Sequence, residues 1–93
     1  MAANTCGTLL EDFSKLQFVI TIRLLRAELA DDIDAAAHAW WIQHHYRISA
    51  PVLGALWSEA RQAADGYRLA GDEAVMGACA SIDRQLTEFD TWP

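Results

Sequence analysis

The chain has 93 residues, of which 53% are hydrophobic, and 7 basic against 13 acidic residues give it a formal charge of -6. This length supports one modest hydrophobic core, and the hydrophobic content excludes an intrinsically disordered chain. The negative charge repels nucleic acid phosphates, so it argues against proteins that bind DNA or RNA without regard to sequence.

Targeting signals and membrane segments are not visible in the sequence. The first residues carry no cationic segment and no small-residue cleavage site, so we expect no signal peptide and a cytoplasmic location. The longest apolar run, residues 16–25, is interrupted by polar side chains and is about half the length that a membrane span needs. Cys6 and Cys79 have no metal or redox spacing, so we interpret both as free thiols, with Cys79 in the core.

The pattern of apolar residues predicts an all-α protein, a small four-helix bundle in a single domain over residues 1–93. We expect helices at about residues 9–30, 32–48, 50–70 and 72–89, the last two forming an antiparallel hairpin because their link is very short. Thr8 and Glu11 have the spacing of a capping box, so the first helix should begin near Leu9. Apolar residues at helical spacing form its core stripe: Leu9, Phe13, Leu16, Ile20, Leu24 and Ala27.

A second apolar stripe, formed by Phe18, Ile22, Leu25 and Leu29, lies on nearly the opposite side of the same helix. One neighbouring layer cannot bury both stripes. Either this helix lies centrally among the other three, or the second stripe meets its symmetry mate in a homodimer, which is the arrangement we favour. Residues 16–24 also alternate with period two, as in a strand, but no second strand is available for pairing, so we predict a helix.

Three acidic residues, Asp31, Asp32 and Asp34, indicate the start of the second helix, because carboxylates there cap free amides and stabilise the helix dipole. We expect a break near residues 30–32, with one continuous helix over both segments as the alternative. One arc of the second helix collects large apolar side chains and is its predicted buried face: Ile33, Ala37, Trp40, Trp41, His44 and Ile48.

The third and fourth helices have clear boundary signals. Ser49 and Pro51 are typical of a helix start, and Gly71 followed by Asp72 is typical of one helix ending and the next beginning. The predicted buried face of the third helix is Val52, Leu53, Leu56, Trp57, Ala60, Ala63, Ala64 and Tyr67. That of the fourth helix is Val75, Ala78, Cys79, Ile82, Leu86 and Phe89.

Asp34, His38 and His45 are weak candidates for a metal site, because they project within about 40° of one another on helix 32–48. The two imidazoles lie roughly 10 Å apart along the helix axis, too far for one ion without ligands from a partner. We therefore favour a helix-stabilising contact between Asp34 and His38, with His45 at the surface or in an interface. We expect no metal and no cofactor.

Trp40, Trp41, His44 and Trp57 are the candidates for a ligand pocket between the second and third helices. His44 lies among indoles there, a setting that suits a pH-sensitive or acid/base group. The simpler interpretation is a tryptophan-rich core in which a neutral His44 forms a hydrogen bond to a neighbouring helix.

No nucleophile elbow, phosphate loop or other catalytic arrangement is present, so we expect no enzyme and no catalytic residues. We predict a non-enzymatic protein-interaction module, an adaptor, regulator or inhibitor of the kind common in phages and mobile elements, with a helical surface for a protein partner. The alternative is a small-ligand or metal-binding protein, and a helix-turn-helix regulator ranks lowest because Arg61 and Arg68 give only a thin basic face. The predicted partner or self-interface is Phe18, Ile22, Leu25, Leu29 and Trp92.

Overall fold

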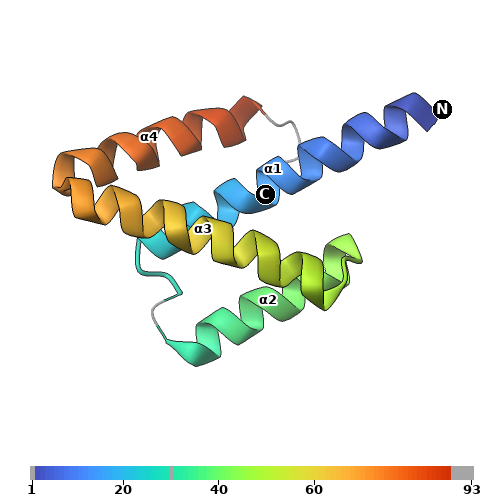
Figure 1. Cartoon of the computed structure of the whole chain (residues 1–93), viewed down its shortest axis with the longest axis horizontal. Coiled ribbons are helices and arrows are strands. Elements are labelled where there is room, and N and C mark those ends of the chain that lie inside the picture. The colour runs from blue at the N-terminus through green and yellow to red at the C-terminus, as the bar shows by residue number, and fades with distance from the viewer. Residues whose placement is uncertain (1, 30, 89–93) are drawn as a thin grey trace.

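The computed structural model describes residues 2–29 and 31–88, with side chains from residue 13 onward. Over these residues the chain forms four helices and no strand, which confirms the all-helical prediction. They are α1 (Ala2–Leu25), α2 (Asp32–Tyr46), α3 (Ala50–Ala70) and α4 (Asp72–Glu88), as Figure 1 shows. Among the described residues, no helix combines the length and the apolarity that crossing a membrane requires. The predictions for Phe89, Trp92 and the side chains of Cys6, Thr8, Leu9 and Glu11 lie outside the described part of the chain.

Helix α1 differs from its predicted bounds at both ends. Its backbone is helical from Ala2, so the start expected near Leu9 is wrong. It ends at Leu25 because Ala27 adopts the left-handed conformation, with φ at 59°. The Ala27 N–H then donates to the Leu24 carbonyl at 3.2 Å, and the Glu28 N–H donates to the Arg23 carbonyl at 2.9 Å. These two bonds form a Schellman motif, which ends α1 a few residues before the break predicted near residues 30–32.

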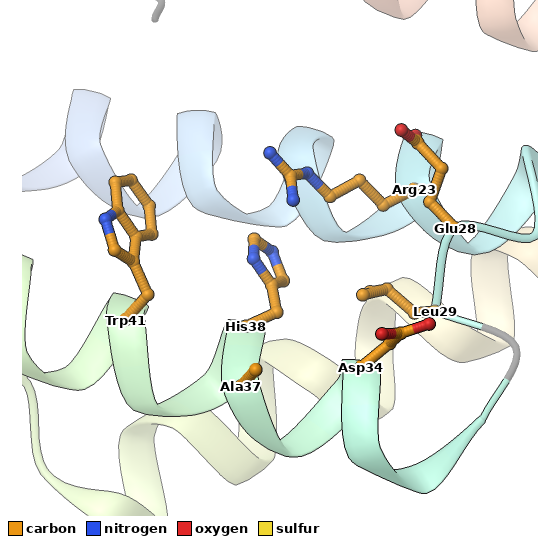
Figure 2. A pocket seen from close by; sticks show the side chains of 7 residues that line it. All are labelled: Arg23, Glu28, Leu29, Asp34, Ala37, His38 and Trp41. Atoms are coloured by element: carbon orange, nitrogen blue, oxygen red, sulfur yellow. The ribbon is translucent and has the colours of Figure 1, made fainter.

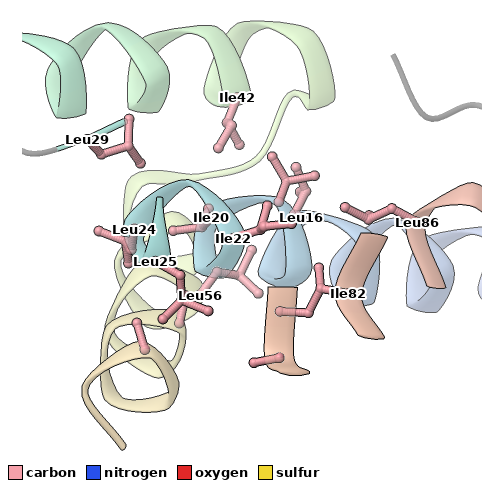
Figure 3. Packing of buried hydrophobic residues seen from close by; sticks show 14 of the residues in the cluster. Leu16, Ile20, Ile22, Leu24, Leu25, Leu29, Ile42, Leu56, Ile82 and Leu86 are labelled. Atoms are coloured by element: carbon pink, nitrogen blue, oxygen red, sulfur yellow. The ribbon is translucent and has the colours of Figure 1, made fainter. Parts of the chain in front are cut away.

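Helix α1 lies among the other helices, and α3 and α4 both pack against it (Figure 1). Leu16 and Ile20 of the first stripe are fully buried. From the second stripe, Ile22, Leu25 and Leu29 are buried as well, at 2%, 8% and 7% exposure. Figure 3 shows the buried side chains of the other helices around α1. The structure therefore follows the intramolecular alternative, in which a central helix uses both apolar stripes.

The caps predicted for α2 and α3 are present. The Asp31 side chain accepts a hydrogen bond from the Asp34 N–H at 2.7 Å and begins α2. Ser49 begins α3 by accepting from the Val52 N–H, with Pro51 in the first turn. Arg47, in the left-handed conformation with φ at 55°, ends α2 before Ile48.

The predicted buried face of α2 is wrong. The helix buries His38 and Ile42, which lie on the opposite side from most of the predicted arc. The exposed side chains are Ile33, Ala37, Trp40, Trp41 and His44, whereas Ile48, beyond the helix end, is half-buried against the core. The apolar residues of α2 are distributed around its whole circumference, so its sequence does not favour one face over another.

Helices α3 and α4 bury the faces that their periodicity predicts. The buried residues are Leu53, Leu56, Ala60 and Ala64 on α3, and Ala78, Ile82 and Leu86 on α4. Val52, Ala63 and Tyr67 of the predicted arc are exposed, so α3 buries only part of its predicted face. Cys79 is a half-buried free thiol against the core. Gly71 alone separates the two helices, and its φ of 114° lies in a region that favours glycine.

Candidate functional site

An open pocket with a volume of about 740 Å³ lies between α1 and α2. Helix α1 and the turn after it supply one wall, and the i, i+3 and i+4 spacing of α2 places its residues on the facing wall. The lining residues are Arg23, Glu28, Leu29, Asp34, Ala37, His38 and Trp41, shown in Figure 2.

The charged groups of the pocket are separated along its length. In Figure 2 the Arg23 side chain extends from α1 over His38, while Glu28 and Asp34 lie at the end away from Trp41. The Arg23 guanidinium forms no hydrogen bond or ion pair with any described residue. The neighbouring Asp31 carboxylate raises the pKa of Asp34, first by charge repulsion and second by a hydrogen bond between the two side chains.

His38 is the buried polar residue of this pocket. Its side chain is 6% exposed, and its Nε2 atom has no hydrogen-bond partner among the described residues. The ring is parallel to Trp41 at a centroid distance of 6.2 Å and tilted against Trp57 at 5.9 Å. Burial, and then the positive charge of Arg23, lower the pKa of His38 to about 4, so the imidazole is neutral at neutral pH.

The three metal candidates do not meet. Within the described part of the chain, no group of three or more His, Cys, Asp and Glu side chains is arranged to hold a metal ion. The contact expected between Asp34 and His38 is absent, because His38 turns toward α1 and the indoles instead. His45 stacks on Trp41 with ring centroids 4.9 Å apart. Asp34 and His38 therefore contribute to the pocket and not to a metal site.

The predicted pocket of Trp40, Trp41, His44 and Trp57 does not form. Only Trp41 lines the pocket between α1 and α2, and Trp57 is half-buried against the core. His44 is exposed; its Nδ1 donates to the Trp40 carbonyl at 2.9 Å, and its ring stacks on the indole with centroids 4.1 Å apart.

A row of exposed apolar and aromatic side chains occupies the side of α2 that faces solvent. Ile33 is 80% exposed, Trp40 61% and Trp41 38%. Each of the two tryptophans stacks with the histidine one turn further along the helix, which fixes the indoles in place. We name this surface the outer face of α2, defined by Ile33, Ala36, Ala37, Trp40, Trp41 and His44.

The interface predicted from the second stripe of α1 is not at the surface. Ile22, Leu25 and Leu29 contribute to the core, and Phe18 is half-buried against it. Sequence reasoning also missed Arg23, whose charge within an apolar helix was the available signal for a polar site beside the core. Lys15, another basic residue of α1, is 4% exposed.

No known protein family, curated protein or solved structure matches this chain.

Proposed function

We propose that this protein is a non-enzymatic interaction module, an adaptor, regulator or inhibitor, that binds a protein partner through the outer face of α2. One observation carries the proposal: Ile33 and Trp40 are 80% and 61% exposed on the same face of one helix. Exposed large apolar residues are unremarkable singly, but a contiguous row on one helix is typical of an interaction surface.

The energetics support a protein partner. Burying a large apolar side chain contributes roughly 1.5 to 3 kcal/mol, so covering Ile33 and Trp40 favours association by several kcal/mol before the costs of binding. Tryptophan is enriched among the residues that dominate binding energy, because it combines a large apolar area with one hydrogen-bond donor. Stacking on His44 and His45 restricts the two indoles, which lowers the entropy lost on binding.

The charge around this face indicates the chemistry of the partner. Asp31, Asp32 and Asp34 are exposed at the N-terminal end of α2, and the whole chain carries a formal charge of -6. A partner with an apolar groove and a basic rim complements both features, as in a protein whose nucleic-acid-binding site is blocked by an acidic inhibitor.

Self-association remains a second prediction, on a different surface from the one expected. The second stripe of α1 is buried, so a homodimer would have to use the outer face of α2. Each copy carries a formal charge of -6, and like net charges oppose this pairing. We therefore favour a basic partner over a second copy.

We place the protein in the cytoplasm, and we treat α3 and α4 as an antiparallel hairpin, joined at Gly71, that supports α1. The close packing of both helices against α1 and the single residue between them support this topology.

The test is affinity capture from extracts of the source cells with three forms of the protein. Wild type is compared with Trp40→Ser, and with Leu69→Ser as control, because Leu69 is 90% exposed on α3 and outside the outer face of α2. We expect one partner to be captured by wild type and Leu69→Ser and lost with Trp40→Ser, and the purified partner to reproduce this difference in a binding titration. Equal capture by Trp40→Ser would contradict the proposal.

A further inference from the structure

The pocket between α1 and α2 contains one positive and two negative side chains, and they lie toward different ends of it (Figure 2). We propose that this pocket, which shares Ala37 and Trp41 with the outer face of α2, is a second binding site, and that its ligand is a free α-amino acid with an aromatic side chain. Such a ligand carries a carboxylate, an ammonium group and a flat apolar body, and the pocket offers a complementary group for each.

Arg23 is the group for the carboxylate. Its guanidinium reaches into the pocket from α1 and forms no hydrogen bond or ion pair with a described residue, although Glu28 and Asp34 line the same pocket. A planar guanidinium binds a carboxylate through two parallel hydrogen bonds, which fix the orientation of the ligand in addition to neutralising its charge.

Glu28 and Asp34 are the groups for the ammonium. Both carboxylates lie at the end of the pocket away from Trp41, one on the turn after α1 and the other in the first turn of α2 (Figure 2). They also discriminate against ligands that are only anionic, such as phosphate, because like charges at this end repel them.

Trp41 and Ala37 accommodate the apolar body, and aromatic rings pack favourably on an indole. His38 contributes a hydrogen-bonding atom. Its buried Nε2 lacks a partner in the described chain, and the ring lies beneath the Arg23 side chain in Figure 2. A carboxylate drawn to the guanidinium approaches the imidazole too, and a buried polar atom gains most from a new hydrogen bond.

Calorimetric titration with three related compounds tests the ligand class. The probes are L-phenylalanine, phenylpropanoate, which lacks the amine, and phenylethylamine, which lacks the carboxylate. We expect L-phenylalanine to bind with a dissociation constant of roughly millimolar order, as suits a ligand of this size. Each analogue should bind at least about ten-fold more weakly. Absence of L-phenylalanine binding, or equal binding of either analogue, would overturn the proposal.

Substitutions test the site. Arg23→Gln should weaken L-phenylalanine binding about ten-fold or more, whereas Arg84→Gln, an equal charge change at an exposed residue of α4, should leave it unchanged. Asp34→Asn is the second variant, because Asp34 is exposed and its loss of charge leaves the core intact; Asp65→Asn on α3 is its control. Circular dichroism verifies folding of each variant. Equal weakening of L-phenylalanine binding by the control of each pair would place the binding site elsewhere. So would unchanged binding in Arg23→Gln and Asp34→Asn.

Discussion

Helices α1 and α2 are both rich in apolar residues, yet the fold uses them differently. Between Lys15 and Leu25, most side chains of α1 are buried, because other helices surround it. On α2 only His38 and Ile42 are buried, and two tryptophans on the other side remain in solvent. The apolar content of a helix therefore does not determine its burial; its place in the bundle does. The uncovered side of α2 is the part of the molecule left for recognition.

The strongest contrast concerns two isoleucines. Ile20 on α1 is fully buried, whereas Ile33 on α2 is 80% exposed. Ile20→Ala should lower the free energy of unfolding by about 2 to 5 kcal/mol, because it removes buried methyl groups and leaves a cavity. Ile33→Ala should change it by less than about 0.5 kcal/mol, since alanine is also a good helix former. Urea denaturation of both variants measures the difference, and a large loss with Ile33→Ala would show that the outer face of α2 is covered by its own chain.

The buried His38 of α2 should couple the stability of the fold to pH. The pKa of His38 in the fold is about 4, below its ordinary 6.5, so between these values the unfolded chain binds the proton more strongly. The free energy of unfolding should therefore fall by about 1 to 3 kcal/mol as the pH drops from 6.5 to 4, at roughly 1.4 kcal/mol per unit of pKa, and this loss should level off below pH 4.

Two variants isolate this effect in urea denaturation at a series of pH values. His38→Gln should remove most of the slope between pH 6.5 and 4, while His45→Gln, at an exposed position, should retain it. A slope unchanged in His38→Gln would mean that other groups carry the pH dependence.

Sequence patterns predicted the helix boundaries where a side chain acts on its own backbone. Ser49 and Asp31 cap the helices that follow them, and Gly71 ends α3 in a conformation that favours glycine. Ala27 ends α1 in the left-handed conformation without a glycine, so the end of α1 had no such signal. The exposed side of α2 was not predictable either, because the apolar residues of that helix are distributed around its whole circumference.

Gly71, which follows α3, and Gly66, inside it, test whether Gly71 is required by its backbone conformation. An added Cβ would meet no atom within 4 Å at Gly71 or at Gly66, so only the conformation differs. Gly71→Ala should destabilise the fold by about 1 to 2 kcal/mol, because its φ of 114° strains any other residue. Gly66→Ala, inside the helix, should stabilise it by about 0.5 to 1 kcal/mol. Thermal unfolding followed by circular dichroism compares them, and equal effects would contradict the requirement for glycine.

Alanines at the end of α1 and in the middle of α2 give the smallest expected effect. Ala27→Gly should stabilise the fold by up to about 1 kcal/mol, because glycine adopts the left-handed conformation without strain. Ala36→Gly, at an exposed position inside α2, should destabilise it by about 1 kcal/mol. The same thermal measurement applies, and a loss of stability in Ala27→Gly would argue against the Schellman motif.

The candidate site was predicted only in part. Trp41, Asp34 and His38 were recognised from the sequence as candidates, but Arg23 and Glu28 join them because the fold places α1 and the turn after it opposite α2, which periodicity within one helix does not encode. The tryptophan-rich pocket failed for the same reason, since Trp40 and Trp57 face away from a shared space. Residue types indicated the chemistry, and the arrangement of the helices determined which residues meet.

The central claim is that Trp40 lies in solvent on the free protein. Fluorine NMR of protein labelled with fluorotryptophan tests it through the shift of each resonance between light and heavy water, with Trp40→Phe and Trp57→Phe assigning the signals. We predict a large solvent shift at Trp40, 61% exposed, and a much smaller one at Trp57, half-buried against the core. A small shift at Trp40 in the free protein would contradict the account, because the outer face of α2 would then already be covered.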